Sequence, residues 1–436
     1  MTTTTTATTG PSTVSGPRFA RRQITAIVFG VVGVALVALV APNLSDASKR
    51  FTFEPPPNAA GVSFSPPALV TAIAVVFMIT AVLSFLGPKL DRFAGWAQLI
   101  SAVLIIPLVL AIALARSTAE GTNVTNLLVQ SLVLSTPIAL GAMTGLWCEH
   151  SGIVNIGIEG MMLSSAGVGF MAYALFGDAT NTQWLWVAVL VAVLTGGLLG
   201  ALHAWLTVTF RVNQIISGVV INLFALGLTG FLRSEVIIKQ GITTGQPLGR
   251  IGIPLLDRIP VIGNQLFKEQ PIFFLMFVVV AGTWLVMYKT PWGLRVRSSG
   301  ENPHAAETLG VDVIKIRYQA VILGGMIAGL GGAWFSLEAQ GGFEDNMTNG
   351  VGFIALAAMI FGKWKPWSAF AGAVLFGFTR ALGARMQILD VQIAGFTIPS
   401  NFWQMLPYVA TLVVVAGAVG RAVAPAAEGT PYERSR

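Results

Sequence analysis

Long apolar stretches separated by short polar segments run through almost the whole chain. Each stretch is about 20 residues long, the length that an α-helix needs to cross a hydrocarbon layer of roughly 30 Å. A helix bonds its own backbone groups inside lipid, so the pattern predicts an all-α polytopic membrane protein. About twelve spans are expected, at residues 24–41, 68–86, 96–115, 127–147, 156–176, 184–206, 215–232, 272–288, 319–337, 351–362, 367–383 and 402–420. The tenth is short enough to be a partial crossing.

The distribution of small and polar residues divides the chain into four parts. Residues 1–23 are rich in Thr, Ser, Gly and Pro and have little to bury, so we expect a disordered cytoplasmic tail. Residues 24–125 hold three simple Val, Ala, Leu and Ile spans, interpreted as an N-terminal extension of scaffold or anchor helices. Residues 126–423 are dense in small residues, which let membrane helices approach closely, and predict a nine-helix core. Residues 424–436 form a second cytoplasmic tail.

Composition supports membrane residence and argues against several other classes. Of the 436 residues, 54% are hydrophobic and 10% are charged, compared with about 25% charged in soluble domains. The single cysteine, Cys148, cannot form a disulfide framework, and the three histidines lack the spacing of metal ligands. We therefore expect no catalytic, cofactor or metal site. The net charge of +7 is better explained by basic cytoplasmic loops than by a nucleic-acid partner.

Lysine and arginine predict the orientation. If the N-terminus is cytoplasmic and every span crosses once, the inner segments hold 16 basic residues and the outer segments nine. This excess favours both termini inside. The loop after span nine carries Glu338, Glu344 and Asp345 and no basic residue, which suits the outer side. We expect a multi-pass protein in the lipid of a bacterial cytoplasmic (inner) membrane.

The segment from Trp147 to Leu163 interrupts two apolar spans. Its sequence is WCEHSGIVNIGIEGMML, in which three glycines weaken a continuous helix. Asn155 can cap a new helix, whose first turn then holds Glu159 near the positive end of the helix dipole. A broken helix at membrane depth is tolerated where it lines a cavity or is buried in protein. We therefore place Asn155 and Glu159 on a solute pathway, with an ordinary interfacial loop as the alternative.

Few other polar side chains that could meet the solute fall within the spans. Asn222 is the best single pathway candidate, because an amide inside an apolar helix requires a hydrogen-bond partner. Trp334 and Phe335 could stack on a flat base, since such stacking contributes about 1–3 kcal/mol. Packing in the core or against lipid is the alternative for both. Glu338 belongs either to the pathway or to water at the outer end of its span. The remaining candidates are Gln130, Ser131, Phe224, Arg380 and Gln404.

The segment from Lys289 to Tyr318 is far longer than a turn and carries five basic and three acidic residues. Pro303 suits the first turn of a short helix, and Gly310 suits its end. The pattern predicts a short amphipathic helix that faces the cytoplasm and docks a partner. A solvated loop without a partner is the alternative.

Within this segment, the stretch AAETLG at residues 305–310 resembles the "EAA…G" coupling-helix pattern of ABC importer permeases, with His304 in the place of Glu. The surrounding GLRVRSSGENPHAAETLGVDV resembles the permease family of sugar, branched-chain amino acid and nucleoside importers. The nucleoside (guanosine-type) members are the most similar, over residues 126–432. The stretches that carry this resemblance are SGIVNIGIEGMML, RVNQIISGVVINLFALGLTGFL, GFIALAAMIFGKWKPWSAFAGAVLFGF and IPSNFWQMLPYVATLVVVAGAVGR.

The resemblance implies the permease subunit of an ATP-driven ABC importer for a small polar solute. Nucleosides come first, with a simple sugar or a branched-chain amino acid as alternatives. Three partners are implied: a cytoplasmic ABC ATPase, a second homologous permease in a heterodimer, and an extracytoplasmic substrate-binding lipoprotein. The residues implied in coupling to the ATPase are Gly300, Glu301, Asn302, Pro303, His304, Ala305, Ala306, Glu307 and Gly310.

The chain contains no G-x-x-x-x-G-K-[ST] phosphate loop, so ATP hydrolysis is expected in the partner ATPase and no enzyme activity here. Two alternatives from other classes remain. An ion-driven secondary transporter would use buried ionisable residues, for which Glu159 and Arg380 are the candidates. A membrane scaffold without transport would have no need of a polar broken helix.

Overall fold

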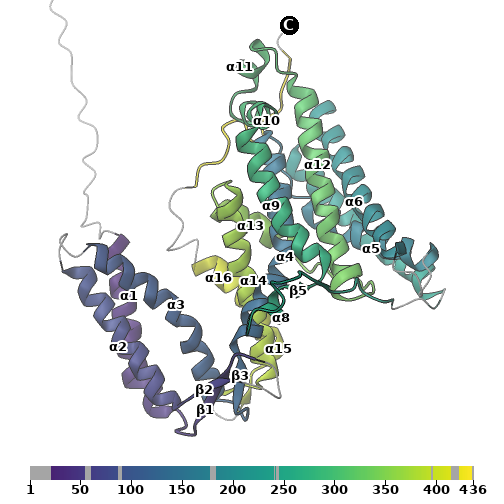
Figure 1. The fold of residues 1–436 in the computed structure, drawn as a ribbon. Helices are drawn as coiled ribbons and strands as arrows, with labels where there is room; N and C mark the ends of the chain where they lie inside the picture. Colours follow the sequence, from purple (N-terminus) through teal and green to yellow (C-terminus); the bar gives the residue numbers. More distant parts are fainter. Residues whose placement is uncertain are drawn as a thin grey trace, which may run out of the picture. The chain divides into compact units, whose positions relative to one another are not determined.

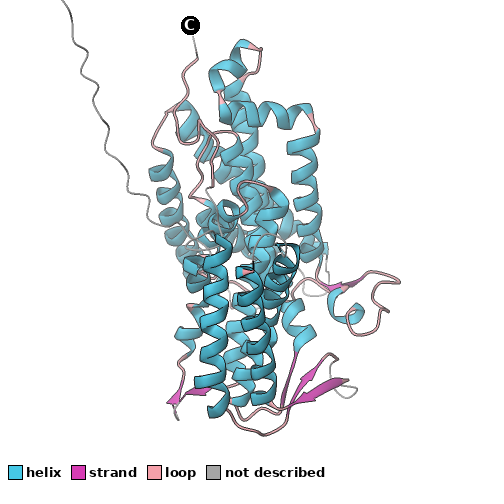
Figure 2. Ribbon diagram, turned by 90° about the vertical axis from the view of Figure 1, so that its left-hand side faces the viewer, coloured by secondary structure: helices cyan, strands magenta, loops and turns pink. Residues whose placement is uncertain are grey.

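The computed structural model describes residues 21–54, 60–86, 91–176, 183–239, 241, 245–393, 396–413 and 422–434. It is mainly helical, and its strands are short and lie in the connections between helices (Figure 2). Among the described residues, nine helices are long and apolar enough to cross a membrane, and they correspond to the first nine predicted spans. The chain divides into two compact units: the described parts of residues 1–52, 59–122 and 389–398, and those of residues 53–58, 123–388 and 399–436.

The first unit consists of three apolar helices and small sheets. Helix α2 packs on both α1 and α3. One side-chain ladder joins α2 to α3: the hydroxyls of Thr80 and Ser101 lie 2.8 Å apart, and the Gln98 amide donates to Ser84 at 3.0 Å. The main sheet has the order β2-β1-β3, with Lys49 opposite Phe64 in an antiparallel β1–β2 pair. The elements are α1 (Arg21–Ala35), β1 (Lys49–Thr52), β2 (Gly61–Phe64), α2 (Pro66–Phe85), α3 (Asp91–Ala115), β3 (Gly121–Asn123), β6 (Gln392–Ile393) and β7 (Phe396–Thr397).

The second unit is built around α4 (Val124–His150), in which every residue from Ser135 to His150 is buried. Helices α9, α12, α13 and α14 pack on α4, and α12 also packs on α5 and α6 (Figure 1). The other elements of this unit are α5 (Ile158–Phe176), α6 (Gln183–Ala204), α7 (Gln214–Leu232), β4 (Ile251–Gly252), α8 (Gly263–Leu266), β5 (Lys268–Glu269), α9 (Pro271–Lys289), α10 (Pro291–Glu301), α11 (Pro303–Thr308), α12 (Val313–Ala333), α13 (Val351–Phe361), α14 (Pro366–Ile388), α15 (Ser400–Gln404) and α16 (Leu406–Val413).

Small residues bring the backbones of α6 and α12 into contact. A side-chain carbon at Gly196 would overlap the carbonyl oxygen of Gly325, and one at Gly325 would overlap that of Gly196. Such close approach gives membrane helices extensive van der Waals contact where the hydrophobic effect cannot drive them together. The Gly-rich segments noted in the sequence therefore face each other across one helix pair.

The last three predicted spans differ in length from one another. Helix α13 has 11 residues, which rise about 16 Å and cross roughly half of the apolar layer. Helix α14 has 23 residues. The predicted span 402–420 begins as α15 and α16, and its residues 414–420 lie outside the described part of the chain. Residues 1–20 of the predicted N-terminal tail also lie outside it.

Candidate translocation site and coupling face

The break between α4 and α5 lies where the sequence predicts it, from residue 151 to residue 157. Side chains satisfy the backbone of this extended segment. The Asn155 side-chain oxygen accepts from the Gly157 amide at 3.0 Å, and the Gln214 side chain accepts from the Val154 amide at 2.6 Å. The Val154 carbonyl oxygen lies 3.0 Å from the ring Nε2 of His203. Backbone groups among packed helices need such partners, so the break is a built feature rather than a loose loop.

Asn222 of α7 holds the start of α5. Its side-chain oxygen accepts from the Gly160 amide at 2.7 Å, and its side-chain nitrogen donates to the Ile156 carbonyl at 3.0 Å. The amide thus finds the partners that an apolar environment demands: Ile156 in the break and Gly160 in the first turn of α5. Asn222 therefore fixes the position of α5 against α7.

Glu159, in the first turn of α5, binds the start of a second helix. Its Oε1 accepts from the Thr348 hydroxyl at 2.6 Å and from the Gly350 amide at 2.8 Å, and its Oε2 accepts from the Gly352 amide at 2.6 Å. Gly350 is the N-cap of α13, with a φ of 79° that favours glycine. The carboxylate therefore caps α13 at the positive end of its dipole.

Helix α13 separates the Glu159 contact from the end of α4. Beyond its far end, the Trp364 indole donates to the Glu149 carboxylate at 2.5 Å, and the Trp364 carbonyl lies 2.9 Å from the ring Nε2 of His150. The end of α4 and the Glu159 contact are thus separated by the 11 residues of α13, about 16 Å. This length is about half the thickness of a hydrocarbon layer of about 30 Å.

Two cavities flank the loop that Glu159 holds, residues 346–350. The larger, which we call the Arg380 cavity, measures about 520 Å³; Asn349 lines it on the loop side. The smaller, the Asn222 cavity, measures about 340 Å³ and is lined by Glu159, Asn222 and Gly350. The Arg380 cavity is also lined by Arg380, Gln387, Asn401, Trp403, Gln404 and Tyr408. Two candidates from the sequence, Arg380 and Gln404, thus share one cavity, and Asn222 and Glu159 share the other.

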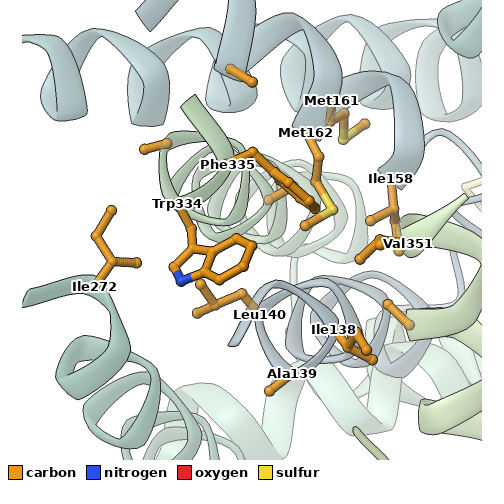
Figure 3. Close-up of a cluster of buried hydrophobic side chains, with 14 of the residues drawn as sticks. Ile138, Ala139, Leu140, Ile158, Met161, Met162, Ile272, Trp334, Phe335 and Val351 are labelled. Carbon is orange, nitrogen blue, oxygen red and sulfur yellow. The ribbon is translucent and has the colours of Figure 1, made fainter. Parts of the chain in front are cut away.

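Trp334 and Phe335 lie in the hydrophobic core. Figure 3 shows them packed among Leu140, Met161 and Met162, and they are 4% and 5% exposed. They are not among the described residues that line either cavity. Their stacking role therefore has no support from their position.

The other sequence candidates occupy different surroundings. Glu338 is buried rather than in water, and its carboxylate accepts from the Ile272 and Phe273 amides at 2.6 and 3.1 Å, which caps α9. Ser131 bonds the Leu127 carbonyl of its own helix. Phe224 is 52% exposed on α7, as expected of a ring that faces lipid.

Helix α11 forms at the position predicted for a docking element. The Asn302 side chain caps it by accepting from the Ala305 amide at 3.0 Å, and Gly310 follows it with a φ of 82°. Within α11 only Ala306 is buried. The next residue after the helix, Leu309, is 85% exposed. A small helix with an exposed apolar residue at its end is available for contact with a partner.

Residues 422–434, which we call the C-terminal strap, lie against this end of the second unit. Figure 1 shows the strap beside α10 and α11. The Ala427 amide donates to the Gly300 carbonyl at 2.8 Å, and the Gly429 amide donates to the Gly152 carbonyl at 3.2 Å. The strap thus joins the end of α10 to the break that precedes α5.

Tyr432 anchors the strap to α11. Its ring is buried against Ala306, and it lies 5.4 Å from the ring of His304. Burial and the neighbouring Glu307 carboxylate raise the pKa of Tyr432 to about 12, so the hydroxyl stays protonated and bonds Glu307. Arg434 forms an ion pair with Glu307 at 3.3 Å. Five predicted coupling residues therefore contact the strap: Gly300, Glu301, His304, Ala306 and Glu307.

A carboxyl pair fixes the middle of the strap. The carboxyl of Glu428 lies near that of Glu149 at the end of α4, and its Oε2 is buried with no hydrogen-bond partner among the described residues. Burial raises the pKa of Glu428, which favours the protonated form that such a pair requires. The sequence predicts only a tail here and does not reveal this docking, because the partners of the strap lie more than 100 residues away in the chain. Thr348 is also absent from the predicted candidates, although the Thr-Asn-Gly run before an apolar stretch is a recognisable helix start.

A known family matches this core. The family described as branched-chain amino acid transport system / permease component matches residues 127–416. The chain belongs to this family. The first 126 residues, which include the three helices of the first unit, lie outside the match.

Several named relatives align with this permease over nearly their whole length. It is 41% identical to the nucleoside ABC transporter permease protein NupC of Lactococcus lactis and 37% identical to the guanosine ABC transporter permease protein NupQ of Bacillus subtilis; each alignment covers 70% of this chain and 96% of the relative. It is 34% identical to a putative glucose ABC transporter permease of Haloferax volcanii, over 68% of this chain and 92% of the relative. No solved structure matches. With its apolar helices, the permease is a multi-pass protein of the bacterial inner membrane.

Proposed function

We propose that this chain is the transmembrane permease subunit of an ATP-driven importer for nucleosides. The observation that carries the proposal is the similarity to two permeases named for nucleoside and guanosine transport, 41% and 37% identical over 96% of their lengths. The exposed, capped helix α11 supports it, because a permease without its own phosphate loop needs a surface on which a separate ATPase acts.

Coupling runs through the segment Gly300–Gly310. The ATPase presses on α11, and Asn302, which ends α10 and caps α11, passes the displacement to α10. Gly300 of α10 lies against the His150 carbonyl at the end of α4, so the two backbones are in direct contact with no side chain between them. A push at α11 therefore reaches the helix around which the second unit is packed.

Transport uses alternating access around the Glu159 contact. The carboxylate joins α5 to the loop that separates the Arg380 and Asn222 cavities. A shift of α13 against α5 moves this loop and connects one cavity with the other. Asn155 and Asn222 position the ends of the break, and Glu159 holds the loop closed.

The same proposal extends to the number of crossings, the orientation and the partners of the chain. The chain has twelve crossings with both termini in the cytoplasm, of which α13 is a half-length one. It pairs with a second, homologous permease and receives solute from an extracytoplasmic binding lipoprotein. The α11 end, with α10 and the C-terminal strap, faces the cytosol.

Uptake of labelled guanosine tests the function. Cells that express the chain together with its proposed ATPase, permease and binding-protein partners should accumulate guanosine, and cells that lack this chain should not. Depletion of ATP should abolish uptake, whereas a protonophore that leaves ATP intact should not. Uptake that a protonophore stops at normal ATP levels would identify an ion-driven transporter instead.

Cysteine labelling tests the orientation. Cys148 is buried, so cysteines placed at exposed positions dominate the signal. Leu309→Cys should react with an impermeant maleimide only in inside-out vesicles. Gln246→Cys, in the exposed segment that follows the span Gln214–Ile238, should react only in intact cells. The reverse pattern would place α11 outside and exclude a cytoplasmic ATPase as its partner.

A further inference from the structure

The side chain of Arg380 has a buried hydrogen-bond donor that no described residue satisfies. It lies on α14 and lines the Arg380 cavity, and its Nη1 atom is buried with no hydrogen-bond partner among the residues that the structure describes. A guanidinium always carries its charge and offers donors only. A buried donor without an acceptor is costly, so a native protein that keeps one at a cavity wall is built to receive an acceptor there.

The neighbouring carboxylate does not supply that acceptor. Both oxygens of Glu159 are already used by Thr348, Gly350 and Gly352. Glu159 acts on Arg380 as a nearby opposite charge, but no hydrogen bond or ion pair between the two is among those of the described residues. The guanidinium is therefore left for a group that enters the cavity.

The rest of the cavity wall indicates the class of that group. Three side-chain amides, those of Gln387, Asn401 and Gln404, offer both donors and acceptors, and two aromatic rings, those of Trp403 and Tyr408, offer flat faces. A volume of about 520 Å³ is in the range of small-molecule sites. Amides beside rings suit a flat heterocycle with polar edges, because bases stack on aromatic faces and bond through their edges.

We propose that the Arg380 cavity binds the base of the transported nucleoside and that Arg380 donates to the oxo edge of a purine. This inference rests on the proposed function. Guanine and hypoxanthine present O6 and N7 as adjacent acceptors, which match the paired donors of a guanidinium. Adenine presents N7 beside an amino group, whose donors face the donors of Arg380. The cavity therefore selects guanosine and inosine over adenosine.

Transport kinetics of the assembled importer test this assignment. The unmodified complex should take up guanosine and inosine with a lower KM than adenosine. Arg380→Gln should raise the KM for guanosine and inosine at least tenfold and should shrink their advantage over adenosine, because an amide can meet either edge. Arg380→Lys keeps the charge but loses the paired geometry and should fall between the two.

Arg385 supplies a matched control on the same helix. Its guanidinium donates to Asn126 at 2.8 Å, and Arg385 is not among the described residues that line the cavity. Arg385→Gln should leave the ratio of guanosine to adenosine uptake within twofold of the unmodified value. An equal change in this ratio from both variants would assign the effect of Arg380 to general disturbance of α14 and overturn the proposal.

A labelling experiment gives a readout that does not depend on transport. Asn401→Cys lies in the cavity wall, and its reaction with N-ethylmaleimide in the purified complex should be slowed by guanosine and less by adenosine. Gln246→Cys should react at the same rate with or without either. Guanosine uptake by the unmodified complex, together with an unchanged preference in Arg380→Gln and no protection of Asn401→Cys, would overturn the site and leave the function standing. Absence of nucleoside uptake in the unmodified complex would overturn the function itself.

Discussion

The three helices of the first unit and the three most buried spans of the second use apolar residues in opposite ways. In the most apolar stretches of the three N-terminal spans, with mean hydropathies of 2.8, 2.5 and 2.6, only 22%, 33% and 33% of the residues are buried. In α4, α5 and the span that contains α12, the mean hydropathies are 1.6, 1.3 and 1.7, and 72% of the residues are buried. The less apolar helices are the more buried ones. In a membrane, strong hydrophobicity marks a helix that faces lipid, whereas protein contact is made by small and polar residues.

The largest effect is expected where two buried backbones touch. Gly325→Leu places a side chain into the backbone of α6, which cannot move without displacing the core. We expect the amount of folded protein in membranes, measured by fluorescence-detected size exclusion, to fall at least roughly tenfold. At Gly227 of α7 a side chain would meet open space among the described residues, so Gly227→Leu should accumulate normally. Equal accumulation of both variants would contradict the packing role of α6 and α12.

The next largest effect concerns the polar contact at the centre of the core. Glu159→Ala leaves Thr348 and the two amides at the start of α13 without their acceptor, at about 1–3 kcal/mol for each buried group. Nucleoside uptake should fall at least about tenfold while the chain still inserts. Glu344→Ala removes an exposed carboxylate from the connection to the same loop and should change uptake by less than about twofold. Normal uptake in Glu159→Ala would exclude the carboxylate as the holder of the loop.

A smaller effect is expected at the α11 end, where the contacts are partly exposed. A stop codon after residue 421 removes the strap and with it the packing of Tyr432 on Ala306. The loss of about 1 kcal/mol in the placement of α11 corresponds to roughly a fivefold drop in ATP-driven uptake. Glu433→Ala, which removes only an exposed ion pair with Arg211, is the control and should be close to neutral. Full uptake without the strap would show that α11 is held by the core alone.

The smallest effect is expected in the N-terminal unit. Thr80→Val removes the buried hydroxyl contact with Ser101 between α2 and α3. Hydrogen bonds between membrane helices average about 0.6 kcal/mol, so the melting temperature in detergent should fall by no more than about 2 °C. Uptake should not change. A loss of uptake comparable to that of Glu159→Ala would contradict the expectation that contacts within the N-terminal unit matter less for transport than those in the second unit.

Local patterns were predicted well and long-range ones were not. The break before Glu159 and the ends of α11 follow from Gly, Pro and Asn at fixed offsets, which act within a few residues. Arg380 and Gln404 were recognised as candidates, but the cavity that they share depends on how α14 packs beside α15. Trp334 was proposed as a stacking residue but lies in the core. The sequence pattern of an apolar helix does not distinguish an aromatic residue that faces a cavity from one that packs in the core. The strap escaped prediction for a related reason, since short polar segments carry no periodicity that would reveal a docking surface.

The position of the strap matters to anyone who attaches a reporter to this chain. Arg434 pairs with Glu307, so the last described residue lies beside α11. A fluorescent protein or affinity handle fused at the C-terminus would emerge next to the helix on which the ATPase is proposed to act. An inactive fusion of that kind would say little about the untagged chain, and handles are better placed at the other terminus.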